Sequence, residues 1–335
     1  MLTFDQIRGI ISVLIQRDAT ADDINYWTGK RAEDLVYALL KSNDYYKIHK
    51  PGAFTNAASS FDLYDIIKKY ELRSRTPSPG YLVNFMGVKY PIEVAPGLKK
   101  FDGAVGPIPI PDYLHADMAE WAAVLRAVEL ASGTFRMAEL GCGWGCWMNN
   151  AGVAAKRRAL RVHAIGVEAD EGHLSFARRS LAANGFDPSE YTLHHGVAAA
   201  APGIAWFPKQ DFAGSDWGLT PVFGAQPSNP ERFHSYPMVP FAQMVGDETL
   251  DLLHIDIQGG EYDLISSCCE ILNERVAYLV VGTHSRTIEG AIMDTLLTAG
   301  WKLEVERAAI FDLTNARADL VVDGLQGWRN PRLQR

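Results

Sequence analysis

The chain has 335 residues, of which 47% are hydrophobic and 21% charged, and its formal net charge is −8. This length predicts one large domain, or a domain of about 200–250 residues with a small companion. The acidic balance argues against a nucleic-acid partner, because phosphate-binding surfaces are usually basic. No apolar run reaches the ~18–20 residues that a membrane-spanning helix needs. The four cysteines form no CxxC pair and MLTFDQIRG lacks the features of a signal peptide, so we expect a cytoplasmic chain with reduced thiols.

Residues 1–48 are predicted to form a small all-α domain. Isoleucines and leucines recur at helical spacing within 7–15 and 35–40, and Thr20 or Asp22 can cap a helix between them. The stretches LIQRDATADDINYW and LLKSNDYY resemble a short helical repeat domain of bacterial surface and glycan-modifying proteins. That resemblance implies no chemistry.

Residues 49–112 are predicted to form an extension rather than a domain. Small and turn-forming residues in 49–60 indicate a linker, and 61–73 has the pattern of a helix. Residues 81–94 have a strand-like composition around Met86-Gly87, which predicts a hairpin. Glycines and four prolines in 96–112 indicate a loop.

Residues 113–335 are predicted to form an α/β domain. An amphipathic helix follows His115, and helical stretches then alternate with seven strand candidates: 135–140, 161–168, 191–195, 250–257, 276–283, 301–306 and 319–323. Such alternation predicts a doubly wound, mainly parallel, Rossmann-like sheet. Ligands bind such sheets outside the carboxyl ends of the strands.

The segment FRMAELGCGWGCW (135–147) is predicted to be a strand, a glycine-rich turn and a helix start. Gly141, Gly143 and Gly145 give GxGxG instead of the GxGxxG of dinucleotide binding, and a P-loop is absent. Glu139, two residues before the first glycine, would repel a diphosphate and suits a cationic group such as an amine. Glu168 ends the second strand, where an acid can accept both ribose hydroxyls.

This pattern resembles the class I S-adenosylmethionine-dependent methyltransferases, and another nucleotide-binding fold, NAD enzymes included, is the alternative. The resemblance implies that His115 closes over the methionine end of the cofactor. It further implies a set of residues around the cofactor: Glu139, Gly141, Cys142, Gly143, Gly145, Glu168, Ala169, Gly196 and Val197. The thiols of the loop are expected to serve mainly as small packing groups.

Three blocks in order resemble the FkbM family of methyltransferases over about residues 113–325. They are VEADEGHLSFARRSLAANGFDP, DLLHIDIQGGEYDLI and VGTHSRTIEG. The resemblance implies methylation of hydroxyl oxygens of sugars or polyketides. The chain departs from the family pattern in having Gln258-Gly259-Gly260 before Glu261, with one fewer acid.

Two polar residues follow neighbouring strands and are the catalytic candidates. Asp256 ends the fourth strand and His284 follows the fifth. An alkyl hydroxyl needs a general base or a cation that lowers its pKa, so the pair is predicted to act as the base or to hold one Mg²⁺ or Mn²⁺ ion. Asp256 could instead cap the next helix. His254 is expected to be a core histidine, and Glu261 to have a helix-start role.

The predicted reaction is S-adenosylmethionine-dependent O-methylation of a hydroxyl on a sugar or glycan-like metabolite. The alternatives are a polyketide or other small-molecule O-methyltransferase with a divalent metal, and a non-catalytic module that docks to a glycan-assembly complex through residues 1–48. A long insertion at 198–249 carries Trp206 and Trp217, which either stack on a sugar or anchor the loop to the core.

Overall fold

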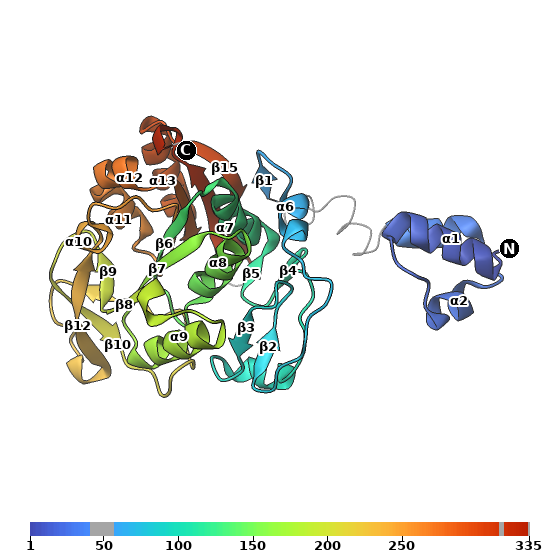
Figure 1. Ribbon diagram of the computed structural model, residues 1–335, viewed down its shortest axis with the longest axis horizontal. Helices are drawn as coiled ribbons and strands as arrows, with labels where there is room; N and C mark the ends of the chain where they lie inside the picture. The colour runs from blue at the N-terminus through green and yellow to red at the C-terminus, as the bar shows by residue number, and fades with distance from the viewer. Residues whose placement is uncertain (41–56, 315–317, 334–335) are drawn as a thin grey trace.

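The computed structural model describes residues 1–40, 57–314 and 318–333. The first part contains three helices, α1 (Phe4–Ile15), α2 (Ala21–Trp27) and α3 (Ala32–Leu40). They share a small core that includes Ile7, Ile11 and Leu35, and Figure 1 shows α1 and α2 apart from the main body. Thr20 caps α2 in a capping box with Asp23, one of the two predicted caps. Residues 41–48 of the predicted domain lie outside the described residues, and the predicted domain division stays a prediction.

A single eight-stranded sheet organises the rest of the chain, and it confirms the predicted fold class. The strand order is β1-β15-β18-β14-β13-β6-β7-β8, in which the last five are parallel and β18 is antiparallel to both neighbours. The bounds are β1 (Ala58–Ser59), β15 (Lys302–Arg307), β18 (Gly324–Arg329), β14 (Tyr278–Thr283), β13 (Leu252–Ile255), β6 (Thr134–Leu140), β7 (Arg161–Glu168) and β8 (Tyr191–His195).

The strands near residue 320 match the expectation in part. The predicted strand 319–323 is confirmed as β17 (Asp319–Val322), but among the described residues it pairs with β16 (Ile310–Asp312) in a separate hairpin and does not join the main sheet. The strand that enters the sheet is β18, which was missed because its sequence GLQGWR contains two glycines. A Cβ at Gly327 would lie 3.1 Å from Ala123, so the helix α7 (Met118–Leu130) packs closely over this strand. Part of the expected linker, Ala58–Ser59, is the edge strand β1.

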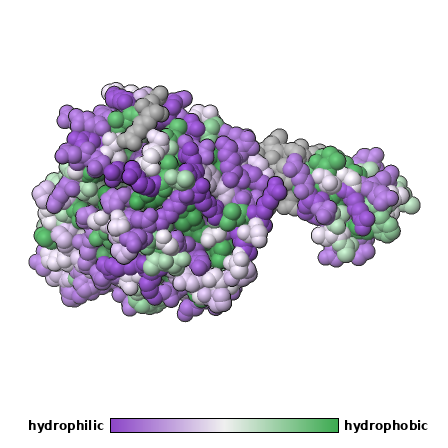
Figure 2. Space-filling view, in the orientation of Figure 1, coloured by the Kyte–Doolittle hydropathy of each residue, from purple (hydrophilic) through white to green (hydrophobic). Residues whose placement is uncertain are grey.

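Helices cover both faces of the sheet. On one face lie α7 (Met118–Leu130), α8 (Cys146–Arg157) and α9 (Glu171–Ala183); on the other lie α10 (Phe241–Val245), α11 (Glu261–Ser267), α12 (Cys269–Arg275) and α13 (Arg286–Thr298). Successive strand residues alternate between two cores, as a pleated strand requires. Leu252 and Val280 belong to the first core, while Leu253 and Val281 belong to the second. On the face seen in Figure 2, hydrophilic residues predominate, with hydrophobic residues scattered among them.

Two additions flank the sheet (Figure 1). The extension contains α6 (Leu63–Lys69), β2 (Tyr81–Val83), β3 (Lys89–Pro91), η1 (Pro96–Phe101), β4 (Asp112–Tyr113) and β5 (Ala116–Asp117). The β2–β3 hairpin is antiparallel, and the Asn184 side chain holds it by accepting from the Lys89 amide and donating to the Lys89 carbonyl. The second addition is a small sheet of order β11-β10-β12-β9: β9 (Val197–Ala199), β10 (Ile204–Pro208), β11 (Val222–Phe223) and β12 (Phe233–Pro240).

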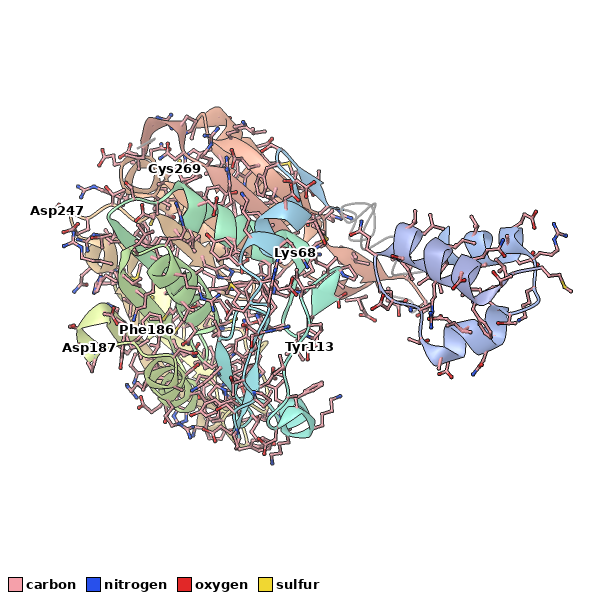
Figure 3. All side chains as sticks on the ribbon, turned by 45° about the vertical axis from the view of Figure 1, so that its right-hand side comes forward. Lys68, Tyr113, Phe186, Asp187, Asp247 and Cys269 are labelled. Carbon is pink, nitrogen blue, oxygen red and sulfur yellow. The ribbon has the colours of Figure 1, made fainter. Side chains whose placement is uncertain are left out.

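Short helical turns complete the described chain: η2 (Pro188–Glu190), η3 (Pro230–Arg232) and η4 (Pro331–Leu333). Figure 3 shows Phe186 and Asp187 in the connection between α9 and β8. The Phe186 ring packs so closely on Gly152 of α8 that a Cβ there would lie 2.5 Å from it. Across the described ranges, none of the helices has the length and apolar character needed to cross a membrane.

Candidate active site

The glycine-rich loop lies across the ends of three adjacent strands. The amides of Gly141 and Cys142 both donate to the carbonyl of Val167 at the end of β7. On the other side, a Cβ at Gly141 would lie 2.0 Å from the carbonyl oxygen of Asp256, and the φ of Gly141 is +75°. Only glycine can be accommodated so close to this oxygen. The loop therefore packs directly against the backbone of Asp256, the residue predicted to be catalytic.

Glu168 is fixed beside the same loop. Its Oε2 accepts from the Gly143 amide at 2.9 Å and its Oε1 accepts from the Asp170 amide at 2.8 Å. The carboxylate is therefore rigidly oriented at the end of β7. Each oxygen keeps a further lone pair, so the group can still accept hydroxyl donors from a ligand.

Glu139 is buried and occupies the start of α8. Its two oxygens accept from the amides of Trp147 and Met148 at 3.1 and 2.8 Å. The N-cap residue Gly145 provides no side-chain cap, so Glu139 supplies one from the neighbouring strand. Burial raises the pKa of Glu139 to about 7. Its expected contact with a cationic part of a ligand stays a prediction.

The remaining predicted cofactor residues lie in different surroundings. The thiol of Cys142 is buried and faces Gly166, as expected of a packing residue. Ala169 and Val197 are buried together with Ala205 in the core of the small sheet. Gly196 packs against β12, where a Cβ would lie 2.4 Å from the carbonyl oxygen of Pro237. Their roles toward a ligand stay predictions.

A chain of polar contacts leads from α7 to the strand before Asp256. Glu120 accepts from the indole Nε1 of Trp147 at 3.0 Å, and the same oxygen lies 3.0 Å from His254 Nε2. Burial opposes a charge on His254, but Glu120 raises its pKa above the ordinary value. His254 is thus a satisfied buried histidine, as expected.

His115 lies in an aromatic surround beside this chain. The residue is exposed to solvent, but its imidazole ring packs near four aromatic rings, those of Tyr90, Trp121, Trp144 and Trp147. The sequence predicted that His115 would cover one end of the cofactor. That role stays a prediction.

Asp256 and His284 do meet, and Glu261 joins them. Asp256 Oδ1 lies 3.4 Å from His284 Nε2, while Glu261 Oε1 lies 3.0 Å from His284 Nδ1. Glu261 is fully buried and also accepts from the amides of Ile257 and Gly259. Glu261 is the first residue of α11, as expected, but the contact with His284 was missed. Asp323, whose Oδ1 lies 3.8 Å from His284 Nε2, was missed as well.

The charges of this group are strongly coupled. Burial opposes a charge on His284, but Glu261 first, then Asp256 and Asp323, raise its pKa to about 9. Partial burial, with the repulsion of Glu120 and Glu261, raises the pKa of Asp256 to about 6 despite the opposing effect of His284. Near neutral pH the arrangement is therefore a protonated histidine between two carboxylates.

One ligand atom each from Asp256, Glu261 and His284 lies within 4.8 Å of the others. The two carboxylates, however, face different nitrogens of the same ring. A cation could meet Asp256 and His284 Nε2, with Glu261 orienting the ring from the other side, an arrangement common around metal-bound histidines.

No family model matches the chain. The chain is 38% identical over 274 residues to a protein of Jannaschia sp. (strain CCS1) named "Putative methyltransferase", a match that spans 80% of this chain and 98% of the other.

Among solved structures, methyltransferase FkbM from Methylobacillus flagellatus KT is 14% identical, over 63% of this chain and 55% of that one, with a TM-score of 0.40. Precorrin-6y C5,15-methyltransferase from Geobacter metallireducens GS-15 is 11% identical, over 64% and 89%, with a TM-score of 0.37. Likenesses of this size support no inference about the reaction.

Proposed function

We propose a specific reaction for this chain, which belongs to the methyltransferase family: S-adenosylmethionine-dependent O-methylation of a hydroxyl on a sugar or glycan-like metabolite. The observation that carries the proposal is the pairing of Asp256 with His284 at the strand ends, with the Asp256 backbone directly against Gly141 of the glycine loop. The sugar class rests on the resemblance of three ordered motifs to the FkbM family. The cofactor supplies a methyl group that is already activated on a sulfonium.

The glycine loop and Glu168 are the proposed cofactor site. Gly141 is exposed, so a ligand can approach its backbone closely, while Gly143 is buried beside it. Glu168 is held by two backbone amides and retains lone pairs for the ribose hydroxyls. Holding the cofactor here, next to Asp256, would place an acceptor oxygen within reach of both, which is chiefly a positioning task.

Asp256 is the proposed proton acceptor and His284 its positioning residue. With a pKa of about 6, Asp256 is ionised at neutral pH and can take the hydroxyl proton. With a pKa of about 9, His284 is protonated at neutral pH and is a poor base there. Its positive charge, held by Glu261, orients Asp256 and favours an ionised acceptor oxygen.

A bound Mg²⁺ or Mn²⁺ ion is the second candidate for this role, and the closeness of Asp256 to His284 Nε2, with Glu261 on the other ring nitrogen, favours it. Such an ion would need Asp256 and a neutral His284, since a protonated ring has no free lone pair. The raised pKa of His284 opposes this at neutral pH. Turnover that survives a chelator at pH 7 would argue for the proton-acceptor role, and loss restored by Mn²⁺ for the metal.

The decisive experiment measures S-adenosylhomocysteine release with a panel of free and nucleotide-linked sugars. Asp256→Asn should lower turnover by about 10²–10⁴-fold, the usual contribution of a general base, without changing S-adenosylhomocysteine affinity. Asp263→Asn is the matched control, because Asp263 is exposed in the same helix start. Unchanged turnover in Asp256→Asn would refute the catalytic assignment. Absence of cofactor binding by the folded wild type would refute the function as a whole.

A further inference from the structure

An aromatic side chain from the insertion lies on the glycine loop. Gly143 lies so close to Trp217 that a Cβ there would be 2.8 Å from Cζ3 of the indole. The indole also stacks on the His173 ring, with centroids 3.8 Å apart and planes 8° from parallel. Trp217 is 38% exposed as a whole residue, so it is not sealed into the core by these contacts.

His173 links this stack to Glu168. Its Nδ1 lies 3.7 Å from Glu168 Oε1. Its Nε2 is an acceptor, because the amide of Gly214 donates to it at 3.3 Å and the Gln210 side chain lies 3.2 Å away. The ring proton is therefore assigned to Nδ1, facing Glu168. Trp217, His173 and Glu168 thus pack in a row, and Glu168 at the end of the row is the proposed acceptor of the ribose hydroxyls.

The segment that carries Trp217 is fitted closely to this position. A Cβ at Gly172 in α9 would lie 2.4 Å from Cβ of Ala213, and a Cβ at Gly214 would lie 2.3 Å from the carbonyl oxygen of Val94. Together with Gly143, three glycines permit this approach. These close approaches hold the segment against α9 and the extension, so Trp217 forms a wall of the site.

We propose that Trp217 binds the adenosyl part of the cofactor by stacking its indole on the adenine ring. The inference rests on the proposed function and deepens it by assigning a wall of the same site. Glu168 and Gly143 are proposed to border the ribose, and the base attached to that ribose would extend along the neighbouring aromatic surface. Of the two roles predicted for this tryptophan, anchoring and sugar stacking, the structure shows the first, and the new assignment replaces the second.

The test is calorimetric and kinetic binding of S-adenosylhomocysteine to the full chain. Aromatic stacking on a base contributes about 1–3 kcal/mol by alanine substitution, so Trp217→Ala should weaken binding by about 5–150-fold, mainly through faster dissociation. Trp217→Phe should retain most of the affinity. Phe212→Ala is the matched control, because Phe212 is 59% exposed in the same segment and should leave binding unchanged.

The outcomes separate the two proposals. If the wild type does not bind S-adenosylhomocysteine, the proposed function fails. If the wild type binds and Trp217→Ala binds equally well, the stacking assignment alone is overturned. Tighter or faster binding by Trp217→Ala would also overturn it, because the indole would then obstruct the site. Binding of free L-homocysteine should be unaffected by the substitution, since that fragment lacks the base.

Discussion

Replacing Glu261 by glutamine should reveal how much the ion pair with His284 stabilises the fold. Glutamine keeps the shape of the side chain and an oxygen for the amides of Ile257 and Gly259, but it removes the negative charge next to Nδ1. The pKa of His284 should then fall from about 9 toward or below its ordinary value, because burial is no longer opposed by Glu261.

The magnitude follows from the pKa difference between the folded and unfolded chain. His284 has a pKa of about 9 when folded and a reference value of 6.5, and each unit corresponds to about 1.4 kcal/mol. Because the folded pKa is the higher one, the stabilisation is complete below about pH 6.5 and is lost as the pH rises through about 9. For Glu261, Asp256 and Asp323 together it amounts to about 3 kcal/mol at pH 6, about 2.5 at pH 7 and less than about 0.5 at pH 9, and Glu261 is the largest contributor, so Glu261→Gln should lose most of it.

Urea unfolding of the wild type and Glu261→Gln at pH 6, 7.5 and 9.5 measures this difference. The destabilisation should shrink steadily with rising pH, and NMR titration of the histidines should show the lowered pKa. Glu270→Gln is the control, since Glu270 is exposed in the adjoining helix α12. A destabilisation that does not change with pH would refute the reasoning and leave Glu261 with only its two amide contacts.

Three further outcomes are expected. Turnover should rise as Asp256 ionises near pH 6 and fall as His284 loses its proton near pH 9; a profile flat between pH 5 and 7 would contradict Asp256 as the base. Gly141→Ala should lower the free energy of unfolding by about 3 kcal/mol, because the new Cβ meets a carbonyl oxygen at 2.0 Å. Asn184→Ala should lower the free energy of unfolding by about 2 kcal/mol, measured with urea, since it leaves the Lys89 amide without its side-chain acceptor. Wild-type stability of Gly141→Ala or of Asn184→Ala would contradict the corresponding structural argument.

The parallel core of the fold was predictable from the sequence because its strands are apolar and regularly spaced. β6, β7 and β8 fall at or within one residue of the expected ranges. β18 was not predictable in the same way, because Gly324 and Gly327 weaken any strand signal. Those glycines are explained only by what packs on them, which the sequence does not reveal.

The candidate site was predictable in part for a similar reason. Asp256 and His284 could be paired because both follow neighbouring parallel strands, and strand ends meet at one edge of a sheet. Asp323 comes from the connection before an antiparallel strand that was missed, so its approach to His284 had no signal. Trp217 lies in an irregular segment, where no periodicity indicates which surface a side chain contacts.

The position of β18 also bears on how the chain is made. Among the described residues, β18 lies between β14 and β15, and β1 pairs with β15, so this side of the sheet is joined through a strand that follows both of its neighbours in the sequence. During synthesis, the edge of β14 that pairs with β18 stays unpaired and exposed until Gly324–Arg329 has been translated. A chain that stops before Gly324 would retain the glycine loop and both strands beside it, yet would expose a strand edge able to recruit other chains. Rapid translation of Gly324–Arg329 would therefore protect the newly made protein from aggregation.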